Sequence, residues 1–265
     1  PTDEELSTLQ YRPEDIGPWF NVSNAELTVY HMWDESMVGV AALDDTTHTV
    51  TFSSKLGHPP GGFNVHKYVV WNVREGLKAP GQWYLDRTAG KVVYWPLPGQ
   101  DMKRVEVLAP TAESIFTVVG SKDQRVQDVT LRGLKLAVTT TPLKSGGFGA
   151  GVFAGAVQLA WTADCRLSEL TIFNTGGQGI KATESNGLTV EGCEVRNVGA
   201  CGIRVHGHLG LRLVTGGDDV YEQLALRLPG LVGCVVAACV DARARPILQG
   251  ALPDDDEVSG LVHGH

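Results

Sequence analysis

Gln158, Lys181, Arg204 and His206 combine hydrogen-bonding and cationic groups at a spacing that could bring them to one surface. The first three follow one another at intervals of 23 residues, and His206 lies two residues beyond Arg204. In an extended strand, residues two apart point to the same face. Amide, ammonium, guanidinium and imidazole groups on one face could hold a sugar or a uronate through hydrogen bonds and charge. The alternative interpretation is a solvated face of a sheet.

These positions contain no carboxylate, which limits the chemistry that they could perform. Hydrolysis of a glycosidic bond normally needs two carboxyl groups facing one groove. By residue type, Lys181 or Arg204 would instead suit the abstraction of a proton beside a uronate carboxylate. The acidic groupings 218–219 and 254–257 are runs of consecutive residues, and neighbours on a strand point to opposite faces. We therefore predict substrate-binding residues and assign no catalytic residue.

The stretches 156–159, 179–182 and 202–205 share one pattern and start 23 residues apart. In each, a polar residue lies between two apolar ones, which is typical of a strand with one buried face. A period of about 20 to 25 residues suits one turn of a right-handed parallel β-helix. We therefore expect Val157, Ile180 and Ile203 to stack inside, and the polar residues that follow them to form an outward ladder.

Less regular stretches predict the other strands of each turn. Residues 129–131, 170–172 and 188–190 would form a second stacked strand, with 133–136 and 192–195 as the next register. Loops at corners can absorb the unequal separations, since insertions there leave stacked strands undisturbed. A β-sandwich is the alternative, but sandwiches do not normally keep a fixed phase over many strands.

The sequence thus predicts an all-β chain in which residues 105–265 form a right-handed parallel β-helix. The pattern weakens after His206, and residues 246–248 would lie about two turns beyond Ile203. The last residues fall in the middle of a turn, and natural β-helices normally cap their open ends. We therefore expect a fragment of a longer protein.

Residues 1–104 predict a separate small all-β module. Short strands are expected at 27–30, 37–42, 47–52 and 68–73, followed by a hairpin formed by 83–85 and 91–95. Five of the six tryptophans of the chain lie in this module: Trp19, Trp33, Trp71, Trp83 and Trp95. We interpret them as an aromatic core rather than as a platform that stacks on sugars.

Composition excludes several classes of partner. The net charge is −8 and no run of Lys and Arg occurs, which argues against a nucleic-acid surface. No apolar run is long enough to span a bilayer, and no signal peptide is visible. The five cysteines have no metal-ligand spacing, and we expect buried thiols rather than a disulfide framework. The glycine-rich stretch 145–151 lacks the Lys-Ser/Thr of a phosphate loop and predicts a corner between turns. We predict neither a cofactor nor a metal.

The segment from Asn72 to Arg87, which reads NVREGLKAPGQWYLDR, resembles a signature of β-helix glycoside hydrolases that include α-L-fucosidases and xylanases. In that family a small β module carrying this hairpin precedes or interrupts the main helix. The match includes Gly90, Tyr94 and Pro96, and covers roughly residues 10–206. Gln82 departs from the pattern, because the family commonly has Glu there.

This resemblance implies a carbohydrate-active protein that hydrolyses polysaccharide in its complete form. It also implies a polysaccharide or oligosaccharide partner and an extracellular or periplasmic location, and we expect a monomer. The catalytic carboxylates of the family are expected on later turns than this chain securely contains. The alternatives are a non-catalytic glycan-binding or scaffold β-helix and a polysaccharide lyase.

Overall fold

The computed structural model describes residues 1–145, 149–207, 212–214, 248–251 and 261–262. Within these ranges the chain consists of strands and three short 3-10 helices: η1 (Gly62–Asn64), η2 (Arg74–Gly76) and η3 (Gly149–Val152). The prediction of an all-β chain is therefore confirmed. The chain divides into two compact units. The first contains residues 1–106, 143–152 and the C-terminal strands, and the second contains 107–142 and the residues described between 153 and 214.

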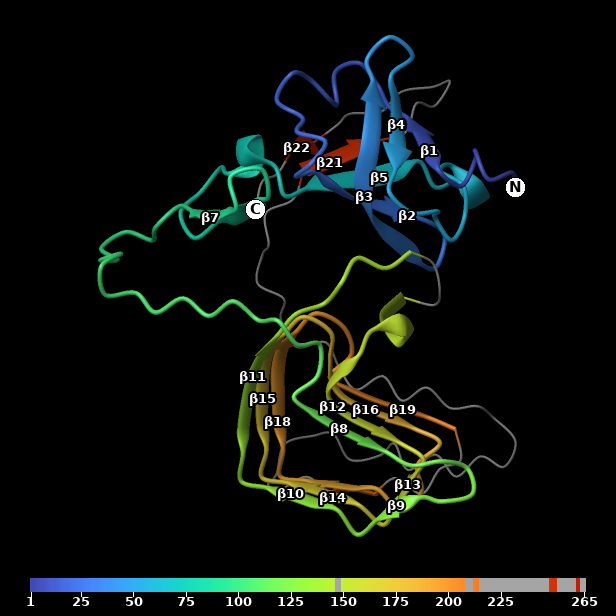
Figure 1. Ribbon diagram of the computed structural model, residues 1–265, viewed down its shortest axis with the longest axis vertical. Helices are drawn as coiled ribbons and strands as arrows, with labels where there is room; N and C mark the ends of the chain where they lie inside the picture. Colours follow the sequence, from blue (N-terminus) through green and yellow to red (C-terminus); the bar gives the residue numbers. More distant parts are fainter. Residues whose placement is uncertain (146–148, 208–211, 215–247, 252–260, 263–265) are drawn as a thin grey trace. The chain divides into compact units, whose positions relative to one another are not determined.

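The first unit is built on a seven-stranded sheet in the order β1-β4-β3-β2-β5-β21-β22 (Figure 1). Every neighbouring pair of strands in it is antiparallel. Its hydrophobic core includes Leu27, Val29, Val38 and Tyr68, all fully buried. The strands are β1 (Thr8–Gln10), β2 (Glu26–Tyr30), β3 (Glu35–Asp44), β4 (Thr49–Phe52), β5 (Lys67–Trp71), β21 (Leu248–Ala251) and β22 (Leu261–Val262).

Strand β21 belongs to this sheet and not to the repeats. The spacing from Ile203 predicted that Leu248 lies in a stacked turn, but Leu248 pairs antiparallel with Val70 of β5. That pairing provides partners for backbone groups at an edge of β5 that would otherwise be open. The prediction for Leu248 is therefore wrong, and the predicted turns between 215 and 247 lie outside the described residues.

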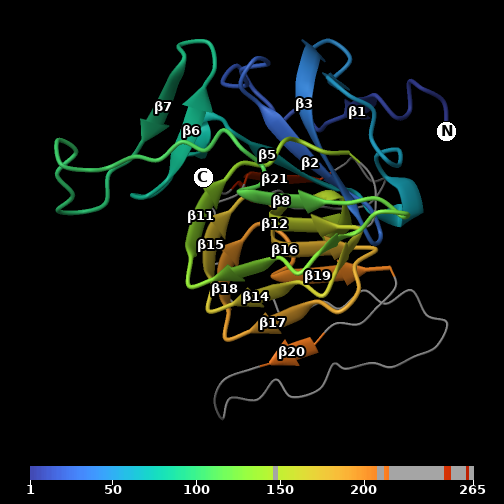
Figure 2. The same ribbon diagram turned by 60° about the horizontal axis from the view of Figure 1, so that its bottom comes forward.

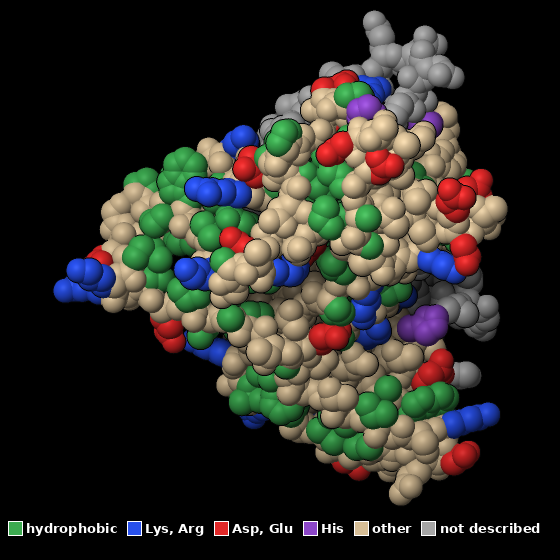
Figure 3. Space-filling view, turned by 45° about the horizontal axis from the view of Figure 1, so that its top comes forward, with side chains coloured by type: hydrophobic (Ala, Val, Ile, Leu, Met, Phe, Trp, Pro, Cys, Tyr) green, Lys and Arg blue, Asp and Glu red, His purple; other side chains and the backbone are tan. Residues whose placement is uncertain are grey.

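The tryptophans of the first unit do not form its core, contrary to our interpretation of the sequence. Trp33, Trp83 and Trp95 expose 51%, 51% and 44% of their surface. Trp19 and Trp71 are half-buried. Aliphatic, Phe and Tyr side chains fill the core instead, because the strands direct them inward at alternate positions. Figure 3 shows exposed hydrophobic side chains in separate patches, with charged groups between them.

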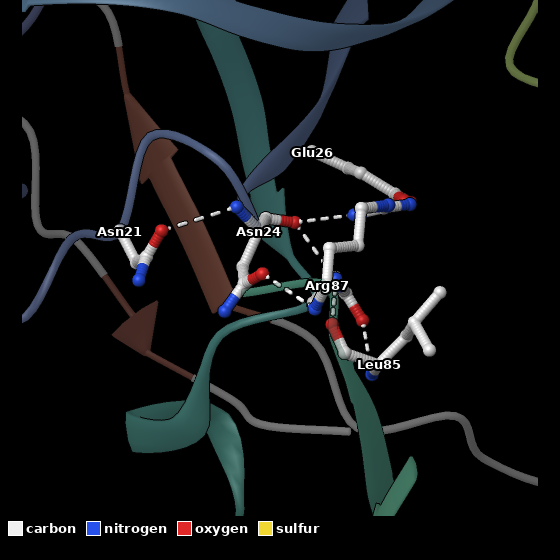
Figure 4. Close-up of polar contacts among 6 residues, drawn as sticks. Asn21, Asn24, Glu26, Leu85 and Arg87 are labelled. Carbon is white, nitrogen blue, oxygen red and sulfur yellow. Dashed lines mark hydrogen bonds and ion pairs between the residues drawn. The ribbon is translucent and has the colours of Figure 1, made fainter. Parts of the chain in front are cut away.

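The hairpin of β6 (Trp83–Asp86) and β7 (Lys91–Tyr94) is fastened to the rest of the unit by Asn72 (Figure 4). The Nδ2 group of Asn72 donates to the carbonyl oxygens of Asn24 and Leu85 at 2.7 and 2.9 Å. Its Oδ1 accepts a hydrogen bond from the Leu85 N–H at 2.6 Å. Asn72 has a φ of 55°, a left-handed conformation that asparagine tolerates better than most residues.

Asn24 and Arg87 complete this attachment. The backbone N–H and the Nη1 group of Arg87 donate to the side-chain and backbone oxygens of Asn24, each at 2.8 Å. The Nη2 group of Arg87 pairs with Glu26, and Asn24 Nδ2 donates to Asp86 at 3.3 Å. The Asn24 N–H in turn donates to Asn21 Oδ1 at 3.3 Å (Figure 4). The signature residues Asn72, Asp86 and Arg87 therefore have a structural role.

The second unit consists of parallel sheets that the chain visits in a constant order (Figures 1 and 2). The first sheet contains β8 (Phe116–Val119), β12 (Gly155–Ala160), β16 (Gln178–Thr183) and β19 (Ile203–His206). A short pair follows, β9 (Val126–Gln127) and β13 (Thr162–Ala163). The next sheet contains β10 (Thr130–Arg132), β14 (Arg166–Ser168), β17 (Thr189–Glu191) and β20 (Arg212–Val214). The last contains β11 (Lys135–Thr139), β15 (Thr171–Thr175) and β18 (Glu194–Val198).

The 23-residue register holds in the first parallel sheet. Val157 pairs with Ile180 and Ile180 with Ile203, as the sequence pattern predicts. Val157 and Ile180 are fully buried in the core of this unit, and Ile203 packs against it. Among the described cysteines, Cys165 and Cys201 are buried free thiols and Cys193 is a half-buried one.

The predicted second strand was placed in the wrong register. Leu131 pairs with Leu167, which pairs with Val190, whereas Ile172 pairs with Leu136 and Val195 in the neighbouring sheet. The first step between paired residues is 36 residues and the second is 23, because an insertion separates β11 from β12. Residues 143–152 of this insertion belong to the first unit, where the Lys144 carbonyl accepts the Met37 N–H at 2.8 Å.

Left-handed residues mark the corners of the turns. One series comprises Asp128, Asp164 and Gly187, with φ values of 57°, 51° and 61°. Three further series occupy equivalent corners: Gly133, Glu169 and Gly192; Val138, Asn174 and Asn197; Trp161, Glu184 and Gly207. Members of each series differ by the same 36 or 23 residues that separate the paired strands. A positive φ at these places therefore bends the chain from one sheet into the next.

Candidate functional site

The four predicted site residues lie on the outward side of the sheet formed by β8, β12, β16 and β19. Gln158 pairs with Lys181, and Lys181 pairs with Arg204. His206 pairs with Thr183 in the adjacent row. All four side chains are half-buried, while the residues that alternate with them point into the core. We define the ladder face as these rows: Thr117, Gln158, Lys181 and Arg204, and beside them Val119, Ala160, Thr183 and His206.

Two members of the ladder face are held by backbone groups of the same unit. Lys181 Nζ donates to the Phe153 carbonyl at 2.9 Å, and the same oxygen accepts a bond from Gln178 Nε2 at 2.9 Å. Gln158 Oε1 accepts the Gly155 N–H at 3.3 Å. These bonds restrict the rotamers of Lys181 and Gln158, which lowers the entropy cost of binding a ligand.

Lys181 and Arg204 place two positive charges at directly paired positions of neighbouring strands. Strands in a sheet lie about 4.8 Å apart, and like charges directly opposite each other are destabilising. An anionic group between the two side chains would offset this repulsion and accept charge-assisted hydrogen bonds. The electrostatics of the ladder face therefore favour a carboxylate-bearing ligand.

The corner beside the ladder face adds residues that the sequence analysis missed. Arg125 lies over the Trp161 ring, with Cζ 5.3 Å from its centroid, and donates to the carbonyls of Thr162 and Glu184. The Glu184 carboxyl group lies over Gly207, where a Cβ would come within 2.6 Å of it. Their place in one 23-residue series was the available signal, although nothing in the sequence marks these residues as left-handed corners.

The other parallel sheets carry their charges as ion pairs. Arg132 donates to both carboxylate oxygens of Glu169, at 2.7 and 3.2 Å, which lowers the pKa of that carboxyl group. Arg166 pairs with Glu191 at 2.6 Å, and Arg196 pairs with Glu194 at 2.8 Å. In the rows of the ladder face within the described chain, by contrast, no Asp or Glu occurs.

Two further searches covered the described part of the chain. It contains no group of three or more His, Cys, Asp or Glu side chains that could hold a metal ion. No helix in it has the length and apolar character needed to cross a membrane. The histidines at 208, 263 and 265 and the acidic runs at 218–219 and 254–257 lie outside the described residues.

Comparison with known proteins identifies a fold likeness. No protein-family model and no curated protein matches the chain. A solved structure named "Glycoside hydrolase" is similar to 76% of this chain, with a TM-score of 0.59 and 17% sequence identity. The likeness covers 44% of that structure, so the chain spans less than half of its length. At this identity the comparison shows a shared all-β fold that contains parallel sheets.

Proposed function

We propose that the second unit is a right-handed parallel β-helix and that the protein is carbohydrate-active. In its complete form it would be a glycoside hydrolase that acts on polysaccharide, outside the cell or in the periplasm, as a monomer. The constant strand order, the 23-residue register and the likeness to a structure named glycoside hydrolase support this proposal. The signature hairpin between Asn72 and Arg87 supports it independently.

The observation that carries the proposal is the alignment of Gln158, Lys181 and Arg204 on one outward row. A polysaccharide is a repeating ligand, and a row of donors repeated on successive strands can contact several of its units. The paired cations favour uronate-containing chains, because each carboxylate would accept charge-assisted hydrogen bonds. In this proposal the ladder face binds substrate, and the catalytic carboxylates come from outside its described rows.

A non-catalytic glycan-binding protein is the second candidate function. The composition of the ladder face favours it, since its described residues supply hydrogen-bond donors and positive charge. A polysaccharide lyase has less support, because Lys181 Nζ donates to the Phe153 carbonyl, which suits a positioned donor better than a proton-abstracting base.

Affinity electrophoresis of the whole chain in gels containing polygalacturonate or neutral xylan tests the binding role. We expect Arg204→Ala to weaken polygalacturonate binding about tenfold, which corresponds to about 1.4 kcal/mol. Added salt should reduce the binding of the unchanged protein. Lys135→Ala is the matched control, because Lys135 is an exposed cation on β11 in a different sheet. Equal affinity of the Arg204 variant and the control would exclude the ladder face.

Product analysis separates the candidate activities. Release of reducing ends without ultraviolet absorbance indicates hydrolysis, and an unsaturated uronate chromophore indicates elimination. Binding without either product supports the glycan-binding protein.

A further inference from the structure

A cluster of aromatic rings lies at the surface of the first unit, far in sequence from the ladder face. Trp33 belongs to the loop between β2 and β3, and His58 and Phe63 belong to the segment between β4 and β5. The Trp33 and Phe63 ring centroids are 4.7 Å apart with a 45° tilt, and the His58 ring lies 5.1 Å from Phe63. Trp33 and Phe63 nevertheless expose 51% and 46% of their surface.

Buried polar groups fix the two loops beneath these rings. The Asp34 side chain is 4% exposed, and its Oδ1 lies 2.9 Å from Nδ1 of the fully buried His31. His31 Nε2 donates to the His58 carbonyl at 3.0 Å, and His58 Nε2 lies 3.9 Å from Asp34 Oδ2. Each loop is therefore tied to the other, so the rings are presented in a fixed arrangement.

The backbone at Phe63 is strained in a way that packing does not explain. Phe63 and Asn64 have consecutive positive φ values of 58° and 61°. A left-handed conformation costs a non-glycine residue about 1 to 2 kcal/mol, and Phe is poorly suited to it. Exposure of the ring leaves little burial energy to offset that cost. Strain of this kind is concentrated at ligand-binding sites.

Charged and polar groups line the same end of the sheet. Glu35 follows Asp34 directly and pairs with Tyr30 across β2 and β3. Lys67 Nζ lies 4.6 Å from the centroid of the Tyr30 ring. Burial, together with the nearby Asp34 charge, raises the pKa of Glu35. Exposed aromatic faces beside carboxylate and hydroxyl groups suit a ligand that has both an apolar face and hydroxyl groups.

We propose that Trp33 and Phe63 form a second carbohydrate-binding site, in which their exposed faces stack on a pyranose ring of a polysaccharide. The choice of ligand class rests on the proposed function, while the site itself rests on the ring cluster, its buried supports and the strained backbone. His58, between the two rings and Asp34, positions the platform. The site would give the first unit a binding role of its own.

The test uses the whole chain and the same two gels, containing polygalacturonate or xylan. We expect Trp33→Ala to weaken binding at least tenfold, without a change in melting temperature. Trp83→Ala is the matched control, because Trp83 also exposes 51% of its surface but lies on the β6–β7 hairpin. Phe63→Gly should weaken binding and raise the melting temperature, since glycine relieves the left-handed strain. A purely structural Phe63 would instead give a lower melting temperature on this substitution.

The outcomes separate this inference from the proposed function. Normal binding by Trp33→Ala with weakened binding by Arg204→Ala would overturn the second site and leave the ladder face in place. The reverse pattern would support the second site and exclude the ladder face. Size-exclusion chromatography covers the remaining explanation: a dimer that only Trp33→Ala dissociates, with unchanged sugar binding, would overturn the inference in favour of a contact between two copies. Failure of the unchanged protein to bind either polysaccharide would contradict both proposals.

Discussion

The side chains of Asn174 and Asn197 stack on one another at a corner of the second unit, with Nδ2 of Asn197 donating to Oδ1 of Asn174 at 3.3 Å. Both residues are left-handed, with φ values of 55° and 50°. Asparagine suits this corner because it tolerates the conformation and its amide can bond to the same amide one turn away. The preceding turn has Val138 at this corner, with a φ of 65°.

Val138→Asn should therefore stabilise the protein. A β-branched residue is strongly disfavoured at positive φ, and removal of that strain should contribute about 1 kcal/mol. The new amide would also extend the ladder of Asn174 and Asn197. Urea unfolding measures the gain. Val119→Asn is the control, because Val119 is an exposed strand residue without a positive φ, and we expect no gain there. A lower urea midpoint for Val138→Asn would contradict this view of the corner.

Substitutions in β16 test which residues face inward. Ile180 is fully buried, so Ile180→Asp should cost several kcal/mol and abolish cooperative folding of the second unit. Lys181→Ala, one residue further along the strand, should change stability by less than about 1 kcal/mol. Thermal melting followed by circular dichroism distinguishes the two variants. Greater damage from the lysine substitution would reverse the assigned faces.

Asn72 should be the most sensitive residue of the signature hairpin. Its side chain makes hydrogen bonds to Asn24 and to both backbone groups of Leu85. Asn72→Gly keeps the left-handed backbone but removes all three bonds, so we expect a loss of about 2 to 3 kcal/mol. Asn72→Ala should lose more, because it adds backbone strain. Hydrogen exchange at the Leu85 amide reports the effect directly, and unchanged protection in Asn72→Gly would show that other contacts hold the hairpin.

The first unit should lose stability at alkaline pH. Burial and the hydrogen bond to Asp45 raise the pKa of Tyr11 from 10.0 to about 12. Burial and the Asp15 carboxylate also raise the pKa of Tyr68. A raised folded-state pKa contributes stability that is fully present below pH 10 and is lost as the pH rises toward 12. Urea midpoints across this range should fall, and Tyr11→Phe should make the decline shallower. An equally steep decline in Tyr11→Phe would assign the loss to other groups.

The predictable parts of the structure are those where period and burial coincide. The 23-residue spacing of Val157, Ile180 and Ile203 was visible because each lies in an uninterrupted turn. Ile172 was assigned to the wrong sheet because the insertion after β11 lengthens one step, and several apolar triplets then fit equally well. Leu248 was misplaced because its partner, Val70, lies in a different unit of the chain.

The candidate sites show the same limit. The ladder face could be predicted because its residues follow the strand period. The cluster of Trp33, His58 and Phe63 could not, since two loops must meet to form it and loop geometry depends on Asp34 and His31 beneath. Composition even favoured the opposite interpretation of the tryptophans, because aromatic residues are common in small cores and the sequence does not report their exposure.

The recurring left-handed corners have a consequence for how this molecule can change in evolution. Trp161, Glu184 and Gly207 differ in size and chemistry, yet each turns the backbone in the same direction at the same point. A duplication or deletion of one 23-residue unit would return the chain to the same corner and the same strand register. The number of rungs, and with it the length of polysaccharide that the surface can span, can therefore vary in whole steps while the flanking turns keep their neighbours.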